Sequence, residues 1–107
     1  MNDRILSFLG ICRRARKLTI GADSAVESLN SGKAQLILYA DDFSRNSLKP
    51  VLIEAERAGV TALKLNRSKE ELSAALGRLC GVLAIEDKGF ADKLRQMTES
   101  EQDQGGE

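Results

Sequence analysis

Two pairs of acidic side chains are the residues of this chain whose types and positions could support catalysis. Asp41-Asp42 and Glu86-Asp87 each follow an apolar run typical of a strand. Ligands of open α/β sheets often bind at the carboxyl ends of strands, where carboxylates can hold Mg²⁺ for phosphate chemistry. However, Asp87 is well placed to cap a helix, and no histidine or phosphate-loop motif completes a site. We therefore expect no catalysis, no resident metal and no other cofactor.

The two cysteines, Cys12 and Cys80, lie in apolar parts of the sequence, without Cys-x-x-Cys spacing and without any histidine in the chain. This pattern does not provide a zinc site. Two buried, reduced thiols suit a cytoplasmic protein. No apolar run has the length or flanks of a signal peptide or a membrane-spanning helix. We expect a cytoplasmic protein that does not contact membranes.

The formal net charge is zero, but the charges are unevenly distributed. Residues 98–107 hold four acids and no base, which leaves 16 basic and 12 acidic side chains in residues 1–97. The basic excess is densest near the N-terminus, and Lys33 adds a further cation; the clustered residues are Arg13, Arg14, Arg16 and Lys17. Such cations can stabilise a helix end or contact phosphates. No aromatic residue lies among them, so stacking of single-stranded bases is a poor fit.

The residues after this basic cluster predict a strand, a glycine turn and a helix. Leu18–Ile20 alternate as in a short strand, and Gly21 interrupts the run. The following apolar residues have helical spacing, and Gly32 ends the helix as a left-handed cap; they are Ala22, Ala25, Val26 and Leu29. Unpaired N–H groups at the helix start could donate to a phosphate, together with the Ser24 hydroxyl. Asp23 could accept from a guanine amino group, or it could be an ordinary acid of a first helical turn.

Four segments of the chain resemble a known family: RRARKL, IGADSAVESL, SGKAQLILYADD and EDKGFADKL, which lie within residues 13–94. They are similar to the kink-turn RNA-binding ribosomal proteins (the L-seven-Ae/L-thirty-e family), and most of all to its bacterial YlxQ-like branch. The resemblance implies a three-layer α/β/α sandwich with a four-stranded mixed sheet. It also implies that structured RNA binds at the glycine turn, Gly21 to Ser24. A loop that packs against an extruded nucleotide would be formed by Leu79, Cys80, Gly81 and Val82.

The chain departs from the family at the start of this helix, where RNA-binding members read Gly-x-Asn-Glu-x-x-Lys. The corresponding residues here are Gly21, Asp23, Ser24 and Glu27. Aspartate lacks the two amide donors of asparagine, and Glu27 would face phosphate with like charge. An alternative hypothesis is therefore a protein-interaction adapter that keeps the fold without kink-turn recognition.

The remaining sequence alternates helical and strand patterns, as in an α/β sandwich. We expect helices from Asp3 to about Ala15, after Ala40 with Leu48, Val51, Leu52, Ala55 and Ala58 on one face, after Ser68, and after Asp87. Strands are expected at 34–40, at the edge position 60–65, and at 82–85. Residues 1–97 form one domain, and the acidic tail 98–107 is expected to be disordered.

The sequence also makes local predictions about the start of the third helix, the ends of the fourth helix and the backbone of Arg16. The third helix begins either at Ser47, which places Pro50 in the first turn, or at Ser44. Ser68 and Glu71 form a capping box, and Leu79 ends the apolar stripe of that helix. Arg16 takes the place of a glycine that close family members usually have, so a left-handed conformation there would be strained.

Together these patterns predict a non-enzymatic RNA-binding protein that acts on ribosomal or other structured RNA. The predicted RNA-binding residues are the basic cluster with Lys33, the helix start including Gly21, Ala22, Asp23, Ser24 and Glu27, and the loop from Leu79 to Val82. We expect no small-molecule substrate.

Overall fold

Five helices and four strands follow one another in the computed structural model, which describes residues 3–105. The elements are α1 Arg4–Arg14, β1 Leu18–Ile20, α2 Ala22–Asn30, β2 Leu36–Tyr39, α3 Arg45–Ala58, β3 Ala62–Lys64, α4 Lys69–Leu76, β4 Val82–Ile85 and α5 Lys88–Gly105. The predicted succession of helices and strands is confirmed; most ends are shifted by one or two residues, but α4 ends earlier, at Leu76, and α5 continues to Gly105.

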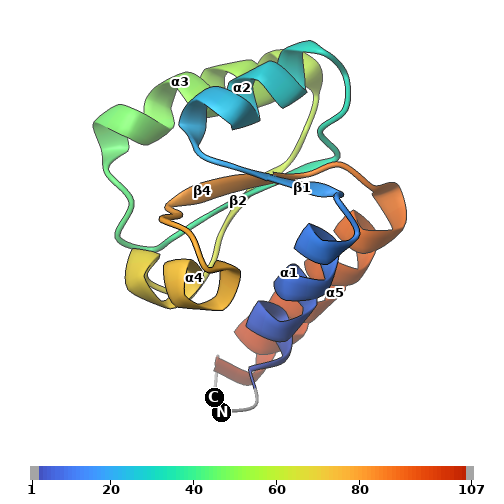
Figure 1. Cartoon of the computed structure of the whole chain (residues 1–107), viewed down its shortest axis with the longest axis vertical. Helices are drawn as coiled ribbons and strands as arrows, with labels where there is room; N and C mark the ends of the chain where they lie inside the picture. The colour runs from blue at the N-terminus through green and yellow to red at the C-terminus, as the bar shows by residue number, and fades with distance from the viewer. Residues whose placement is uncertain (1–2, 106–107) are drawn as a thin grey trace.

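The strands form one mixed sheet in the order β1-β4-β2-β3. β4 pairs antiparallel with β1 and with β2, whereas β3 lies parallel to β2 at the edge. Figure 1 shows α2 and α3 on one face of the sheet and α1, α4 and α5 on the other. The predicted three-layer α/β/α sandwich is therefore confirmed.

Each face of the sheet has its own apolar core, because successive side chains of a strand point to opposite faces. Along β4, Leu83 and Ile85 pack in the core beneath α1, α4 and α5, while Val82 and Ala84 pack in the core beneath α2 and α3. The central strands are buried on both sides, which explains why β2 reads as an unbroken apolar run. Phe43 contacts both cores.

The helix ends follow the predicted local chemistry. Asp3 caps α1 by accepting from the backbone N–H of Leu6, and Asp87 caps α5 by accepting from Phe90. Ser68 and Glu71 exchange the two hydrogen bonds of a capping box at α4. Gly32 follows α2 with φ +78°, as predicted for a left-handed cap.

Two predictions for the third helix can be compared with the structure: where the helix starts, and which of its residues are buried. Ser44 is the N-cap residue of α3, so Pro50 lies inside the helix. Leu52 was expected on the buried face but is 38% exposed, because the face of α3 that packs on the sheet is centred on Leu48, Val51 and Ala55.

The fourth helix ends earlier than its apolar stripe suggested. Leu79 was expected on the buried face of α4, but α4 stops at Leu76 and Leu79 is 84% exposed. Gly77 adopts φ +69° and terminates the helix, which turns Leu79 away from the core.

Residues 98–107 were expected to be disordered, whereas α5 continues through the described residues to Gly105. Thr98 is buried, and its hydroxyl donates to the carbonyl of Leu94. One turn later, Glu101 accepts two hydrogen bonds from Arg67. These contacts hold a polar sequence in helical form, which composition alone does not reveal; residues 106 and 107 lie outside the described chain.

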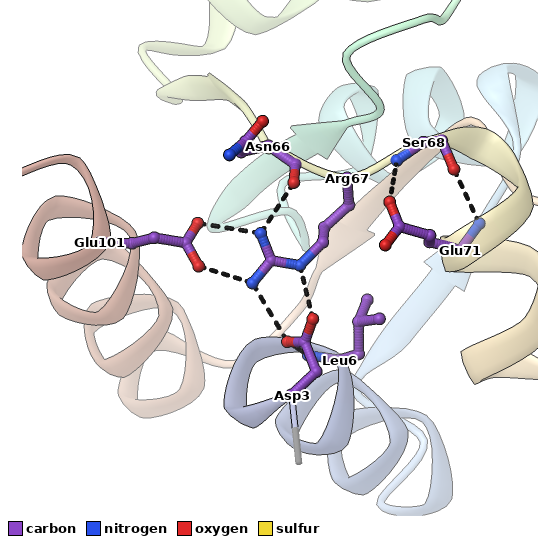
Figure 2. Close-up of polar contacts among 7 residues, drawn as sticks. All are labelled: Asp3, Leu6, Asn66, Arg67, Ser68, Glu71 and Glu101. Carbon is purple, nitrogen blue, oxygen red and sulfur yellow. Dashed lines mark hydrogen bonds and ion pairs between the residues drawn. The ribbon is translucent and has the colours of Figure 1, made fainter. Parts of the chain in front are cut away.

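Figure 2 shows Arg67 joining three segments that are distant in sequence. Its guanidinium donates to Asp3 at 2.7 and 3.2 Å, to Glu101 at 2.6 and 3.0 Å, and to the carbonyl of Asn66 at 2.8 Å. All five N–H groups of the arginine are used, and its side chain is only 11% exposed. These bonds tie the start of α1 and the end of α5 to the β3–α4 loop.

In the stretch from residue 3 to 105, none of the helices has the length and apolar character that crossing a membrane requires.

Candidate functional site

The start of α2 is a glycine turn whose backbone conformation requires glycine. Gly21 has φ +103° and ψ +156°, a region that other residues essentially do not adopt. A Cβ placed there would meet no atom within 4 Å, so the space beside the turn is open. No side chain caps α2, which leaves the first N–H groups of the helix available to an external acceptor. Ligand backbone can therefore approach this turn closely.

One hydrogen bond brings the glycine turn to the predicted second loop. The N–H of Gly21 donates to the carbonyl of Val82 at 2.9 Å. On its other side the loop is held by β2, because the N–H of Ala40 donates to the carbonyl of Gly81 at 2.8 Å. The turn and the loop, about sixty positions apart in the sequence, are therefore neighbours in the fold.

The loop presents only part of itself to solvent. Cys80 and Val82 are buried, and the Cys80 thiol donates to the carbonyl of Val82. Burial raises the pKa of Cys80 to about 11, so the thiol is protonated and unreactive at neutral pH. Leu79 is the exposed apolar side chain of the loop. A ligand at this position would contact Leu79 and the loop backbone rather than Cys80 or Val82 side chains.

Phe43 supports the loop and was not identified from the sequence. A Cβ at Gly81 would lie 2.3 Å from Cδ1 and 2.5 Å from Cε1 of Phe43, so the ring rests against the glycine backbone. Only glycine allows this approach without displacing the ring. The sequence shows only a single aromatic residue in the loop between β2 and α3, which is too weak a signal to pair it with a glycine so far along the chain.

The acidic residues of α2 lie at its surface. Asp23 and Glu27 are exposed, while Ala22 and Ser24 are half-buried. The outward surface of α2 beside the glycine turn therefore carries acidic rather than basic side chains, as the sequence comparison with the family pattern indicated.

The basic residues do not form one cluster around the glycine turn. β4 begins at Val82, beside Gly21, and is followed by Glu86, whose N–H donates to the carbonyl of Lys17. Lys17 thus lies at the opposite end of β4 from Gly21, roughly 13 Å away along the strand. Arg16, next to Lys17, shares that end, and Lys33 follows the distal end of α2.

Arg13 differs from these residues because its side chain reaches toward the loop. A Cβ added at Gly77 would lie 3.6 Å from Nη1 of Arg13, which places the guanidinium beside the end of α4. Arg14 folds back over its own helix, with Nη1 near Gly10. Of the predicted cations, Arg13 is therefore the one that the geometry brings toward Leu79 to Val82.

Three of the four residues in the acid pairs, Asp42, Glu86 and Asp87, have structural roles. Asp42 accepts from the N–H of Lys69 at the start of α4, and Asp87 caps α5 as predicted. Glu86 accepts from the hydroxyl of buried Ser28 at 2.6 Å. Within residues 3–105, no group of three or more potential metal-ligating side chains gathers.

Several proteins are similar in sequence to this chain over most of its length. It is 35% identical over 91 residues to the RNA-binding protein YlxQ of Bacillus subtilis (strain 168), covering 80% of this chain and 86% of the relative. It is 28% identical over 96 residues to the RNA-binding protein YlxQ of Enterococcus faecium, covering 90% and 92%. The large ribosomal subunit protein eL30 of Yarrowia lipolytica (strain CLIB 122 / E 150) is 29% identical over 94 residues, covering 86% of each chain.

Solved structures share the fold. A protein of unknown function from Bacillus halodurans C superposes with a TM-score of 0.84 at 24% identity, covering 92% of this chain and 99% of that chain. The Giardia lamblia 15.5kD RNA binding protein superposes with a TM-score of 0.71 at 22% identity, covering 94% and 92%. The family described as "Ribosomal protein L7Ae/L30e/S12e/Gadd45 family" matches residues 3–95. This chain therefore belongs to the ribosomal protein L7Ae/L30e/S12e/Gadd45 family.

Proposed function

We propose that this protein is a non-enzymatic, cytoplasmic RNA-binding protein that recognises a kink-turn or a similar structured RNA, such as a segment of ribosomal RNA. The observation that carries the proposal is the uncapped start of α2, joined through the Gly21–Val82 hydrogen bond to a loop that exposes Leu79. Backbone donors suit phosphates, and an exposed apolar side chain suits the face of an unstacked base. Relatives named as RNA-binding proteins support this function.

The proposed face combines Gly21, Ala22, Asp23 and Ser24 with Leu79, Gly81 and the backbone of the loop. Arg13 would add a phosphate contact from α1. The remaining cations, Arg14, Arg16, Lys17 and Lys33, would attract RNA through long-range charge without choosing among sequences, because phosphate contacts carry no sequence information.

The test is fluorescence anisotropy of the full chain with a kink-turn RNA and with a plain duplex of equal length, over a salt series. We expect the kink-turn to bind at least about tenfold more tightly, with both affinities falling as salt rises. Leu79→Asp should weaken kink-turn binding by about tenfold and duplex binding less, since it removes the apolar side chain that would pack against an unstacked base and adds a negative charge near the phosphates. Leu52→Asp, an exposed leucine on α3, is the matched control and should change neither affinity.

A second candidate function is a protein-interaction adapter, and exposed Asp23 and Glu27 favour it. The double variant Asp23→Asn/Glu27→Lys restores two of the three family residues that this chain lacks. If the natural protein does not prefer the kink-turn but the double variant does, RNA recognition has been lost and the adapter function is favoured. Tight binding by the natural protein excludes that outcome.

A further inference from the structure

A groove separate from the glycine turn lies between α2 and α3, the helices that cover one face of the sheet (Figure 1). Its volume is about 330 Å³. Val26 lines it from α2, and α3 supplies the other residues: Asn46, Lys49, Pro50, Ile53 and Glu54. Grooves between packed helices of this kind accept the ridge of a third helix.

Most of the groove surface is apolar, although Asn46, Lys49 and Glu54 also line it. Val26, Pro50 and Ile53 present hydrocarbon, and Ile53 is 45% exposed. The neighbouring Leu52 is also exposed, so two large apolar residues follow each other on the surface of α3. Exposed apolar groups rimmed by polar residues are typical of protein-binding sites.

The polar lining of the groove combines one cation, Lys49, with acceptor groups on Asn46 and Glu54. Pro50 has no N–H, so the carbonyl of Asn46, one turn earlier, lacks its usual helical donor. Glu54 contributes a carboxylate; exposed Glu27 does not line the groove but follows Val26 in α2. The pairing of Glu54 with Arg57 is long, at 3.6 Å, and Arg57 is largely exposed, so it neutralises Glu54 weakly.

This pattern favours a protein over RNA as the occupant. Phosphates would be brought near Glu27 and Glu54, and Lys49 is the one cation among the groove-lining residues. A protein segment can offer an apolar side chain to Val26 and Ile53, and an arginine or lysine to the acceptors. We propose that the groove binds an amphipathic helix of a partner protein, with an apolar anchor over Ile53 and a basic residue beside Glu27 and Glu54.

The test selects binders from a displayed library of helical peptides, randomised on one face, with the full-length protein as bait and no RNA present. Peptides that also bind the Ile53→Asp variant are removed. We expect the retained peptides to pair apolar residues with arginine or lysine. Their affinity, measured by fluorescence polarisation, should fall at least about tenfold with Ile53→Asp. With Glu27→Gln/Glu54→Gln it should fall several-fold and lose much of its salt dependence.

Ile11→Asp is the matched control, because Ile11 is 44% exposed but lies on α1, beyond the other face of the sheet. It should leave peptide affinity unchanged. Ile53→Ser is a milder variant to use if thermal unfolding shows that Ile53→Asp destabilises the fold. The proposal is overturned if no peptide depends on Ile53, or if the retained peptides are acidic. It is also overturned if Ile53 variants weaken kink-turn binding as strongly as Leu79→Asp does, since the groove would then belong to the RNA face.

This inference does not require the proposed RNA function. Failure of kink-turn binding leaves peptide selection unaffected, and failure of peptide selection leaves the RNA titration unaffected.

Discussion

At the scale of single residues, Arg16 is the clearest case of a local conflict between sequence and backbone. It has φ +62°, the one positive φ of a non-glycine residue between residues 3 and 105. The turn is nevertheless well formed: the N–H of Arg16 donates to Arg13 and the N–H of Lys17 donates to Cys12, the two bonds of a left-handed helix end. Tertiary packing of α1 therefore imposes a conformation that arginine disfavours.

Arg16→Gly should raise the free energy of unfolding by about 1 kcal/mol, because glycine adopts the left-handed region without a Cβ clash. Urea denaturation measures the change. Arg16→Ala removes the same charge but keeps a Cβ, and it should give little gain. Equal stabilisation by both variants would show that charge repulsion among the basic residues, and not backbone strain, is what the substitution relieves.

Gly81 is constrained by its neighbour rather than by its φ. Gly81→Ala should lower the free energy of unfolding by about 1–3 kcal/mol, since the new methyl group would overlap the ring of Phe43. Gly10→Ala is the matched control: its Cβ would meet only Arg14 at 3.8 Å, so the helix should be stabilised by roughly 1 kcal/mol. If Gly81→Ala is neutral, the Phe43 ring moves freely and does not support the loop.

At the scale of elements, the guanidinium of Arg67 connects α1, the β3–α4 loop and α5 through its hydrogen bonds. Arg67→Gln should lower the free energy of unfolding by about 3 kcal/mol, because two carboxylates lose a nearly buried partner. Arg67→Lys keeps the charge but cannot supply five donors in a plane, so it should lose most of this stability. Thermal or urea unfolding at neutral pH compares the variants, and near-natural stability of Arg67→Lys would show that charge alone holds the elements.

The hydrogen bonds between Arg67 and Asp3 make the free energy of unfolding depend on pH. The hydrogen bonds from Arg67 hold the pKa of Asp3 below its ordinary value near 3.8, against the opposing effect of burial. A lowered folded-state pKa stabilises the protein above the unfolded pKa, and this contribution disappears as the pH falls below about 4. Urea unfolding from pH 5 to pH 2 should therefore show a steeper loss in the natural protein than in Arg67→Gln. Parallel curves would mean that Asp3 is not coupled to Arg67.

At the scale of the whole molecule, the reactivity of the two thiols measures whether one of the apolar cores is opened to solvent. Cys12 and Cys80 both pack in the cluster beneath α1, α4 and α5. Burial raises the pKa of each to about 11, so few thiolates form at pH 8. We expect neither thiol to react with a disulfide reagent in the native state, and both to react together on global unfolding. Earlier reaction of Cys80 alone would show that the Leu79–Val82 loop opens independently.

The sequence by itself determined the succession of elements, because the signals are local. Apolar periodicity located the helices and strands, Asp3, Ser68 and Asp87 marked helix starts, and the continuous apolar run at β2 indicated a strand buried on both faces. Each of these depends on residues within a few positions of one another, and short-range spacing is what a sequence states directly.

The tertiary structure decided which distant residues meet. The Gly21–Val82 bond, the Phe43 ring on Gly81 and the Arg67–Glu101 pair join positions far apart in the sequence. It also separated Lys17 and Lys33 from the glycine turn, turned Leu79 to solvent, and kept the polar end of α5 helical. These outcomes depend on how the sheet orders its strands and where each helix stops, and local composition does not contain that information.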